Sequence, residues 1–142
     1  MLGEAVEGAT VLDLFCGTGA LAIEALSRGA ARAVLVDRAP ALAVRNIRDL
    51  GLDDRAEVVR ADALDYLRRK PERFALAFCD PPYTLADRLE VELDLLVPKH
   101  LEQGARLILE SGAKRPLRLT LPLLRERVYG DAHLAVYGAG EA

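Results

Sequence analysis

The sequence predicts an α/β protein with a doubly wound, seven-stranded sheet that is mostly parallel and ends in an antiparallel C-terminal hairpin. Three observations lead to this expectation. Short apolar runs alternate with helical patterns along most of the chain, which is typical of βαβ units. A glycine-rich turn follows the first apolar run, and Gly130-Asp131 joins the last two runs in the manner of a tight hairpin turn. Because no linker, repeat or low-complexity tract divides the 142 residues, we expect a single domain over 1–142.

Each strand is predicted from a short run rich in apolar or β-branched residues, and each helix from apolar spacing together with a start or stop signal. Pro40 suits a first helical turn, Gly29 and Gly51 suit C-terminal caps, and Pro71 and Pro98 end the helices before them. In chain order the parallel strands are expected at 10–15, 33–36, 57–60, 74–79 and 105–109, and the hairpin strands at 123–129 and 132–137. The helices between the parallel strands are expected at 20–28, 40–50, 63–69 and 85–97.

The composition excludes several classes of protein. Hydrophobic residues make up 51% of the chain and charged residues 29%, which excludes a disordered or fibrous protein. No apolar run reaches the ~18–20 residues of a membrane span, and the acidic N-terminus lacks the layout of a signal peptide. Two cysteines do not make a disulfide framework. We therefore expect a cytoplasmic protein without a membrane partner.

The charge is unevenly distributed. A net charge of −3 argues against a nucleic-acid partner, yet residues 99–127 carry seven Lys or Arg against three Asp or Glu. Within this segment Lys114, Arg115 and Arg118 follow the fifth strand, at the edge of the sheet where we expect the site. They could contact RNA phosphates or simply form a solvated loop.

The first strand leads into a glycine loop with the pattern G-x-G-x-x-A. Gly17 and Gly19 allow a tight turn and a close approach of a ligand to the start of the next helix. Asp37 ends the second strand, 20 residues after Gly17, where a carboxylate can accept hydrogen bonds from both hydroxyls of a ribose. A dinucleotide enzyme and an S-adenosylmethionine enzyme share these features.

Further carboxylates favour a cationic ligand at this loop. Asp13 lies in the loop-forming segment before Gly17, and Asp62 follows the third strand, where it suits an adenine amino group. With Asp37 they would surround the pocket with negative charge. Such a field repels a pyrophosphate and attracts an aminoacyl-sulfonium group.

The fourth strand is followed directly by Asp80-Pro81-Pro82-Tyr83. Since the first and fourth strands are neighbours at the switch point of a doubly wound sheet, Asp80 is expected beside the glycine loop. The two prolines would aim the Asp80 carboxylate and the Pro81 carbonyl at one point, which suits an exocyclic NH₂ group, while Tyr83 offers an aromatic face to a base. Holding both N–H hydrogens positions the amine, and the carboxylate stabilises the positive charge that develops on it, so that no metal is required.

These residues carry a resemblance to a known family. DLFCGTGALAIEALSRGA at 13–30, together with Asp37, Asp62 and DPPY, resembles the Rossmann-like class I S-adenosylmethionine-dependent methyltransferases that modify amino groups. More narrowly, residues 9–138 resemble the RsmD-type bacterial enzymes that methylate guanine N2 in small-subunit (16S) ribosomal RNA. The stretch from Glu126 to Asp131 and the strand after it fit that family's closing hairpin.

The resemblance implies roles for individual residues. The segment from Asp13 to Gly19 would bind the methionine part of S-adenosylmethionine, Asp37 the ribose, Asp62 with Ala63 the adenine, and the tetrapeptide the target base. The implied cofactor-binding residues are Asp13, Cys16, Gly17, Thr18, Gly19, Asp37, Arg38, Asp62 and Ala63, and the implied catalytic residues are Asp80, Pro81, Pro82 and Tyr83. The product would be S-adenosylhomocysteine, the partner ribosomal RNA, naked or in the assembled small subunit, and the protein a monomer.

The start of the chain departs from this family. Members carry several dozen residues before the first strand, including a basic segment that helps to grip RNA, whereas this chain begins about eight residues before it. We therefore expect the N-terminal RNA-binding extension to be missing. Alternative hypotheses are a DNA or protein amino-group methyltransferase, a cofactor-binding fragment without turnover and, outside this class, an NAD-dependent oxidoreductase.

The two cysteines and two histidines are not expected to take part in catalysis or metal binding. Cys16 and Cys79 follow or end neighbouring strands, close enough for a possible bond, but a reducing cytoplasm favours reduced, partly buried thiols. His100 and His133 lack the spacing of a metal site or catalytic triad, and surface or hairpin positions are expected for them.

Overall fold

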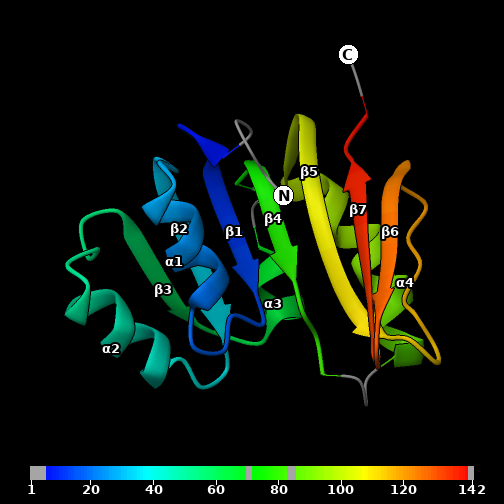
Figure 1. The fold of residues 1–142 in the computed structure, drawn as a ribbon, viewed down its shortest axis with the longest axis horizontal. Helices are drawn as coiled ribbons and strands as arrows, with labels where there is room; N and C mark the ends of the chain where they lie inside the picture. Colours follow the sequence, from blue (N-terminus) through cyan, green and yellow to red (C-terminus); the bar gives the residue numbers. More distant parts are fainter. Residues whose placement is uncertain (1–5, 70–71, 83–85, 141–142) are drawn as a thin grey trace.

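The computed structural model describes residues 6–69, 72–82 and 86–140, with the backbone alone described at 86–88. Within this part of the chain, seven strands form one sheet in the order β3-β2-β1-β4-β5-β7-β6 (Figure 1). The strands are β1 (Thr10–Leu14), β2 (Arg32–Asp37), β3 (Ala56–Arg60), β4 (Phe74–Cys79), β5 (Leu101–Gly112), β6 (Leu123–Tyr129) and β7 (Ala132–Gly138). The helices are α1 (Ala20–Ser27), α2 (Ala41–Asp49), α3 (Ala63–Leu67) and α4 (Ala86–Leu96), and the 3-10 helix η3 (Val97–His100) follows α4.

The sheet has the predicted mixture of directions. Strands β1 to β5 pair in parallel, and β7 pairs antiparallel with both β5 and β6. Strand β1 lies between β2 and β4, with Leu14 opposite Cys79. The chain winds outward from β1 in one direction and then returns to its other side, so the predicted switch point between β1 and β4 is confirmed.

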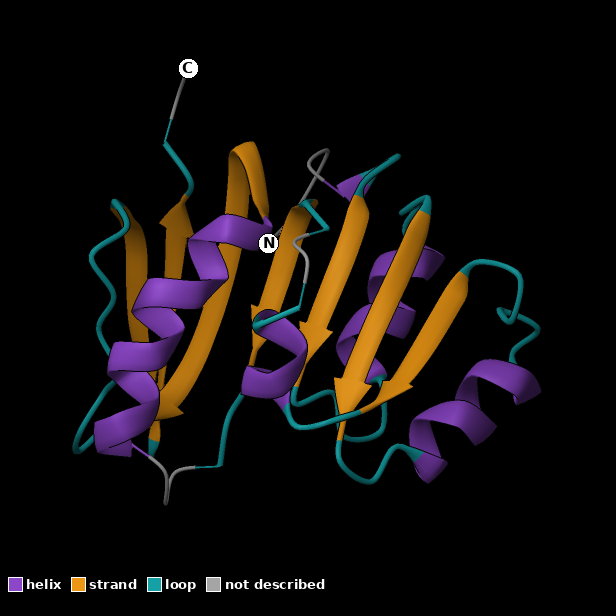
Figure 2. Ribbon diagram, turned by 180° about the vertical axis from the view of Figure 1, so that it is seen from behind, coloured by secondary structure: helices purple, strands orange, loops and turns teal. Residues whose placement is uncertain are grey.

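Helices cover both faces of the sheet. Helices α1 and α2 lie on one face (Figure 1), and α3 and α4 lie on the other (Figure 2). On the first face Leu26 and Ile47 belong to one hydrophobic cluster with Leu35 and Phe78. On the second face Leu67 and Leu93 belong to a separate cluster. Buried on both faces, the central strands need continuous apolar runs, which is why β4 reads as one.

Strand β5 is longer than its apolar run predicts. The run 105–109 forms its centre, but pairing extends to Gly112 because β7 supplies antiparallel partners there. At its start, Leu101 pairs with Phe74 and the register then shifts before Arg106 pairs with Leu76. Because residues 102–104 between these pairs are not apolar, the sequence does not predict that the strand begins at Leu101.

The segment 113–122 joins β5 to β6 and lies along α4. Four consecutive backbone N–H groups in it donate to side chains: Leu117 to Ser111, Arg118 to Glu90, Leu119 to Tyr137 and Thr120 to Asp94. Bonds to both the sheet and α4 therefore fix its path along the hairpin.

The two histidines are buried, which differs from the expectation. His100, in η3, is 1% exposed, and its ring nitrogens lie 2.9 Å and 3.2 Å from the carbonyl oxygens of Leu67 and Glu72. The expectation that His100 lies at the surface is wrong, because the buried ring contacts these two carbonyl oxygens inside the protein. His133 does lie in the hairpin, but it is 4% exposed and contacts Glu126 at 2.9 Å. Among the described residues no helix is long and apolar enough to span a membrane.

Candidate active site

A pocket of about 480 Å³ opens at the carboxyl ends of the parallel strands. Ligand pockets of small molecules commonly measure ~300–1,000 Å³, so its size suits a nucleoside-sized ligand. Three carboxylates, one guanidinium and two prolines contribute to its lining, which consists of Phe15, Asp37, Arg38, Asp62, Ala63, Asp80, Pro81 and Pro82. Seven of these eight residues are among the predicted site residues. The parallel sheet thus brings loops that are far apart in the sequence to one pocket.

The glycine loop beside the pocket has an unusual backbone conformation. Phe15, directly after β1, has φ 59°, a left-handed conformation that is rare for a bulky residue and common at functional sites. Gly17 has φ 56°, and no atom lies within 4 Å of the place where its Cβ would be. Gly19 has φ 83°, but there a Cβ would lie 3.0 Å from Cδ2 of Leu35. Gly17 therefore leaves space open, whereas at Gly19 the positive φ and the nearby side chain of Leu35 on β2 both favour glycine.

Asp37 is held rigidly at the end of β2. One of its oxygens accepts a hydrogen bond from the backbone N–H of Gly17, and the other accepts one from Ala39, both at 2.9 Å. A carboxylate can accept about four hydrogen bonds, so two positions remain for a ligand. The contact with Gly17 also joins the glycine loop to the end of β2.

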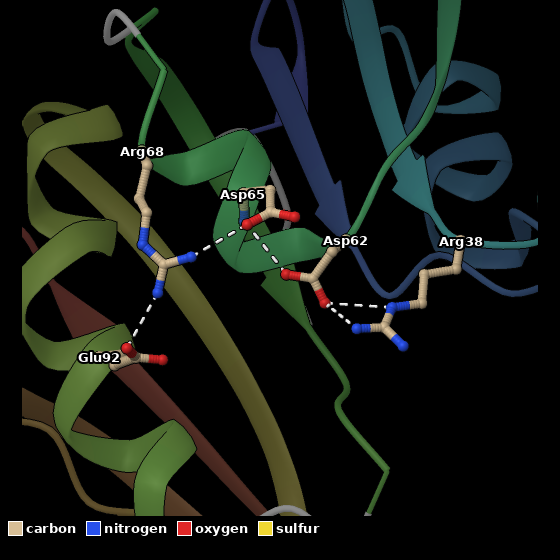
Figure 3. Close-up of polar contacts among 5 residues, drawn as sticks. All are labelled: Arg38, Asp62, Asp65, Arg68 and Glu92. Atoms are coloured by element: carbon tan, nitrogen blue, oxygen red, sulfur yellow. Dashed lines mark hydrogen bonds and ion pairs between the residues drawn. The ribbon is translucent and has the colours of Figure 1, made fainter.

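Asp62 and Arg38 form an ion pair at the rim of the pocket (Figure 3). Oδ2 of Asp62 accepts hydrogen bonds from Nε and Nη2 of Arg38 at 3.1 Å and 2.6 Å, and Oδ1 accepts one from the backbone of Asp65 as the N-cap of α3. Burial opposes ionisation, but the bonds from Arg38 and the backbone outweigh it and lower the pKa of Asp62. Asp62 is therefore ionised and adds a negative charge at the rim of the pocket.

Two further ion pairs, both made by Arg68, lie on the far side of α3. Arg68 contacts Asp65 at 3.0 Å and Glu92 of α4 at 2.9 Å (Figure 3). Arg68 thus connects α3 to the helix that follows the tetrapeptide, outside the pocket lining.

Asp13 lies within the strand expected at 10–15, and it is not among the residues that line the pocket. It belongs to β1, is 1% exposed, and accepts a hydrogen bond from the N–H of Ala22 at 3.2 Å. Because Gly19 is the N-cap of α1 and has no side chain, Asp13 satisfies a free N–H of the first turn in its place. Burial raises the pKa of Asp13 to about 7, the bond from Ala22 opposes this, and the charges of Asp80 and Asp37 add to it.

Asp80 and the two prolines form the opposite side of the pocket. Asp80 is exposed and follows β4, and its N–H lies 3.5 Å from the carbonyl of Leu14 on β1. The surrounding protein raises the pKa of Asp80 to about 6 by desolvation, and the charge of Glu110 contributes. Pro81 is buried and Pro82 is exposed. Tyr83 lies outside the described residues.

The remaining predicted residues are placed near the pocket but outside its described lining. Thr18 is exposed, and its carbonyl accepts a hydrogen bond from Asn46 at 3.0 Å. Cys16 and Cys79 are free and buried, and burial raises the pKa of both thiols, that of Cys16 to about 12. Neither thiol is therefore an activated nucleophile.

Sequence analysis missed two residues at this site. Phe15 ends the first apolar run and was counted only as part of a strand, although its place before the glycine loop could have indicated the pocket. Glu110 directly follows the predicted fifth strand, and the parallel register places it at the same edge as Asp80. Over the described residues, no group of three or more His, Cys, Asp or Glu could hold a metal ion.

The charges of the pocket favour a ligand with positive charge and hydrogen-bond donors. Asp37, Asp62 and Asp80 line it, and Arg38 is already bound to one of them. The open space beside Gly17 allows a ligand to approach the backbone. An adenosine with a cationic sulfonium chain matches this donor and charge set, whereas a pyrophosphate would face three carboxylates.

Three comparisons with known proteins describe what this chain resembles. The family model of "Conserved hypothetical protein 95" matches residues 1–138. The chain is 35% identical over 147 aligned positions to "Putative rRNA methyltransferase YlbH" of Bacillus subtilis, covering 96% of this chain and 79% of that protein.

Solved structures show the same fold. "Putative methyltransferase yhhF" from Escherichia coli superimposes with a TM-score of 0.85 at 30% identity, covering 99% of this chain and 81% of that one. An RNA methyltransferase from Salinibacter ruber, solved with S-adenosyl-L-homocysteine, gives a TM-score of 0.76 and covers 99% of this chain and 88% of that one. At 17% identity this second likeness concerns the fold alone.

Proposed function

The chain belongs to the family described as Conserved hypothetical protein 95, the RsmD-type methyltransferases, and we propose that it methylates the N2 amino group of guanine in small-subunit ribosomal RNA. Membership makes it an S-adenosylmethionine-dependent methyltransferase. The observation that carries the finer proposal is the single pocket in which the carboxylates of Asp37 and Asp62 face Asp80, Pro81 and Pro82. A relative named as an rRNA methyltransferase supports RNA as the substrate.

One side of the pocket would hold the cofactor. Asp37 has two free acceptor positions for the ribose hydroxyls, and the ionised Asp62 would attract the adenine amino group beside Ala63. The open space at Gly17 would receive the methionine part, whose positive charge would favour the ionised form of Asp13. When bound, S-adenosylmethionine supplies a methyl group on a cationic sulfur.

The opposite side would hold the target base. Asp80 and the Pro81 carbonyl would accept the two N–H hydrogens of the guanine amine, which holds its lone pair toward the methyl group. With a pKa of about 6, the Asp80 carboxylate is ionised at neutral pH. It would stabilise the positive charge that passes from sulfur to nitrogen, after which the aminium loses a proton to water. Tyr83 would contact the face of the base.

Transfer of labelled methyl groups tests this proposal. The wild-type protein is expected to label small-subunit ribosomal RNA or isolated small subunits, and digestion of the product should release N2-methylguanosine. Asp80→Ala is expected to abolish labelling, while Asp53→Ala, which removes an exposed carboxylate from the turn after α2, should retain it. Labelling only of DNA or of a protein amine would contradict the substrate. Binding of NADH without binding of S-adenosylhomocysteine would contradict the class of cofactor.

A further inference from the structure

A second pocket, of about 390 Å³, lies between the end of β5 and the turn that joins β6 to β7. It is lined by Gly112, Ala113, Lys114, Arg115 and Asp131. The N–H of Ala113 donates to the carbonyl of Asp131 at 2.8 Å, and the N–H of Arg115 donates to that of Gly112 at 3.2 Å. The hairpin turn therefore fixes the backbone of this pocket.

The second pocket lies on the same edge of the sheet as Asp80. Leu109 pairs with Cys79, the residue before Asp80, and β5 continues for three residues to Gly112. At ~3.3 Å per residue this places the pocket ~10 Å further along β5. In Figure 1 the ends of β4 and β5 and the turn between β6 and β7 all lie at the lower edge. A nucleic acid bound at Asp80 can therefore extend along this edge to the second pocket.

The two pockets have opposite charge. Lys114 and Arg115 are exposed and face one acidic residue, Asp131, whereas three carboxylates line the first pocket. A polyanion approaching Asp80 would be repelled by those carboxylates unless cations beside them hold its phosphates. The second pocket is where the sheet edge supplies such cations.

The basic residues of the segment 113–122 divide into two groups. Arg118 is bound to Glu126 at 3.2 Å, and Glu126 also contacts His133, so Arg118 is tied to the hairpin. Across the described residues, no ion pair holds Lys114. Lys114 and Arg115 line the second pocket, whereas Arg118, which the sequence placed in one cluster with them, does not.

We propose that Lys114 and Arg115 bind a backbone phosphate of the substrate RNA, next to the guanine held at Asp80. This inference rests on the proposed function and adds to it the place where the RNA backbone is held. Contacts of this kind fix the register of a nucleic acid without reading its sequence. Lys114 and Arg115 are positioning residues, since neither touches the reacting atoms.

Salt-dependent binding to a transcript of small-subunit ribosomal RNA tests the proposal. Affinity is measured for the wild type and for Lys114→Gln, Arg115→Gln and the double variant between 50 and 200 mM KCl. Each phosphate contact contributes about 0.7–0.9 to the slope of log affinity against log salt, so the double variant, which loses the contact with one phosphate, should lose about 0.8. Each single variant should bind about three- to tenfold more weakly at the lower salt.

Arg118→Gln is the matched control, because it removes the same charge from the same segment. It is expected to leave the slope unchanged, and all variants should bind S-adenosylhomocysteine as the wild type does and keep its melting temperature. An equal loss of slope for Arg118→Gln would overturn the proposal, since the effect would then be one of general charge. Unchanged slopes in the double variant would overturn it too.

The outcomes also separate this inference from the proposed function. Methyl transfer to RNA combined with unchanged slopes contradicts the phosphate site alone. Loss of slope in the double variant combined with no methyl transfer to any RNA contradicts the proposed function and supports the site. A single-stranded DNA copy that binds as tightly and loses the same slope would overturn the assignment to RNA.

Discussion

The two pockets on one edge of the sheet differ in charge because different parts of the fold build them. The acidic pocket lies where parallel strands end, and Asp37, Asp62 and Asp80 each follow or end one of those strands. The basic pocket lies where the antiparallel hairpin joins β5, with Lys114 and Arg115 after the strand end. The net charge of −3 is a sum over the whole chain and describes neither pocket.

The pockets also differ in how their charged groups are held. Asp37 and Asp62 accept hydrogen bonds from backbone N–H groups, whereas the side chains of Lys114 and Arg115 are exposed. A change in the acidic pocket therefore affects geometry and charge together. A substitution in the basic pocket changes mainly the electrostatic attraction for the substrate. We therefore expect smaller effects on activity there.

The largest effect is expected at Asp80. Asp80→Asn keeps an oxygen that can accept one hydrogen bond but removes the negative charge, so the rate of methyl transfer at saturating cofactor should fall about 100- to 1,000-fold. The affinity for S-adenosylhomocysteine, measured by calorimetry, should change by less than about threefold. A variant with the full rate would show that the charge of Asp80 is not needed.

Asp13→Asn is expected to increase the free energy of unfolding and to weaken the binding of S-adenosylmethionine. Burial raises the pKa of Asp13 from its ordinary value of 3.8 to about 7 in the folded protein, so ionisation favours the unfolded state as pH rises through this window. Asn removes the charge and keeps an acceptor for the N–H of Ala22. The gain in unfolding free energy should therefore grow from pH 5 to pH 8, by roughly 2–3 kcal/mol.

Thermal unfolding at both pH values checks this expectation, with Asp53→Asn as the control for an exposed carboxylate. An equal gain at pH 5 and pH 8 would contradict the role of ionisation. Binding of S-adenosylmethionine should fall about tenfold in Asp13→Asn, because one charge beneath the loop is lost.

Arg38→Met should weaken S-adenosylhomocysteine binding about three- to tenfold. Arg38 fixes Oδ2 of Asp62 and so orients Oδ1 for the adenine, but its exposed position limits the energy of this pair. Arg68→Met is the control, because it breaks the contacts with Asp65 and Glu92 on the far side of α3 (Figure 3). If both variants bind equally weakly, the position of α3 rather than that of Asp62 is responsible.

The smallest effect is expected at Asp131. Asp131→Asn removes the one acidic residue of the basic pocket lining and keeps the carbonyl that accepts from Ala113. Affinity for small-subunit ribosomal RNA at low salt should rise about twofold. A loss of affinity would show that Asp131 itself contributes a contact.

Most of the fold could be predicted from the sequence because its signals are local. The apolar run 74–79 coincides with β4, the Gly130-Asp131 dipeptide does join β6 to β7, and the order of elements places β1 beside β4. These features depend on period, turn residues and right-handed crossovers. Five of the eight residues lining the acidic pocket follow from them, since residues at the ends of neighbouring parallel strands must meet, whereas Arg38 and Ala63 were implied by the family resemblance.

The tertiary structure alone decided which polar groups are bound and buried. Asp13 faces Ala22 across the turn, His100 meets carbonyl oxygens about thirty residues away in the sequence, and Arg118 is drawn to Glu126 while Lys114 remains at the edge. The length of β5 likewise depends on β7, which follows it by some twenty residues. Local patterns determine where an element forms. The partner of a charge is determined by the packing that brings distant segments together, and that packing is what separates an acidic pocket from a basic one.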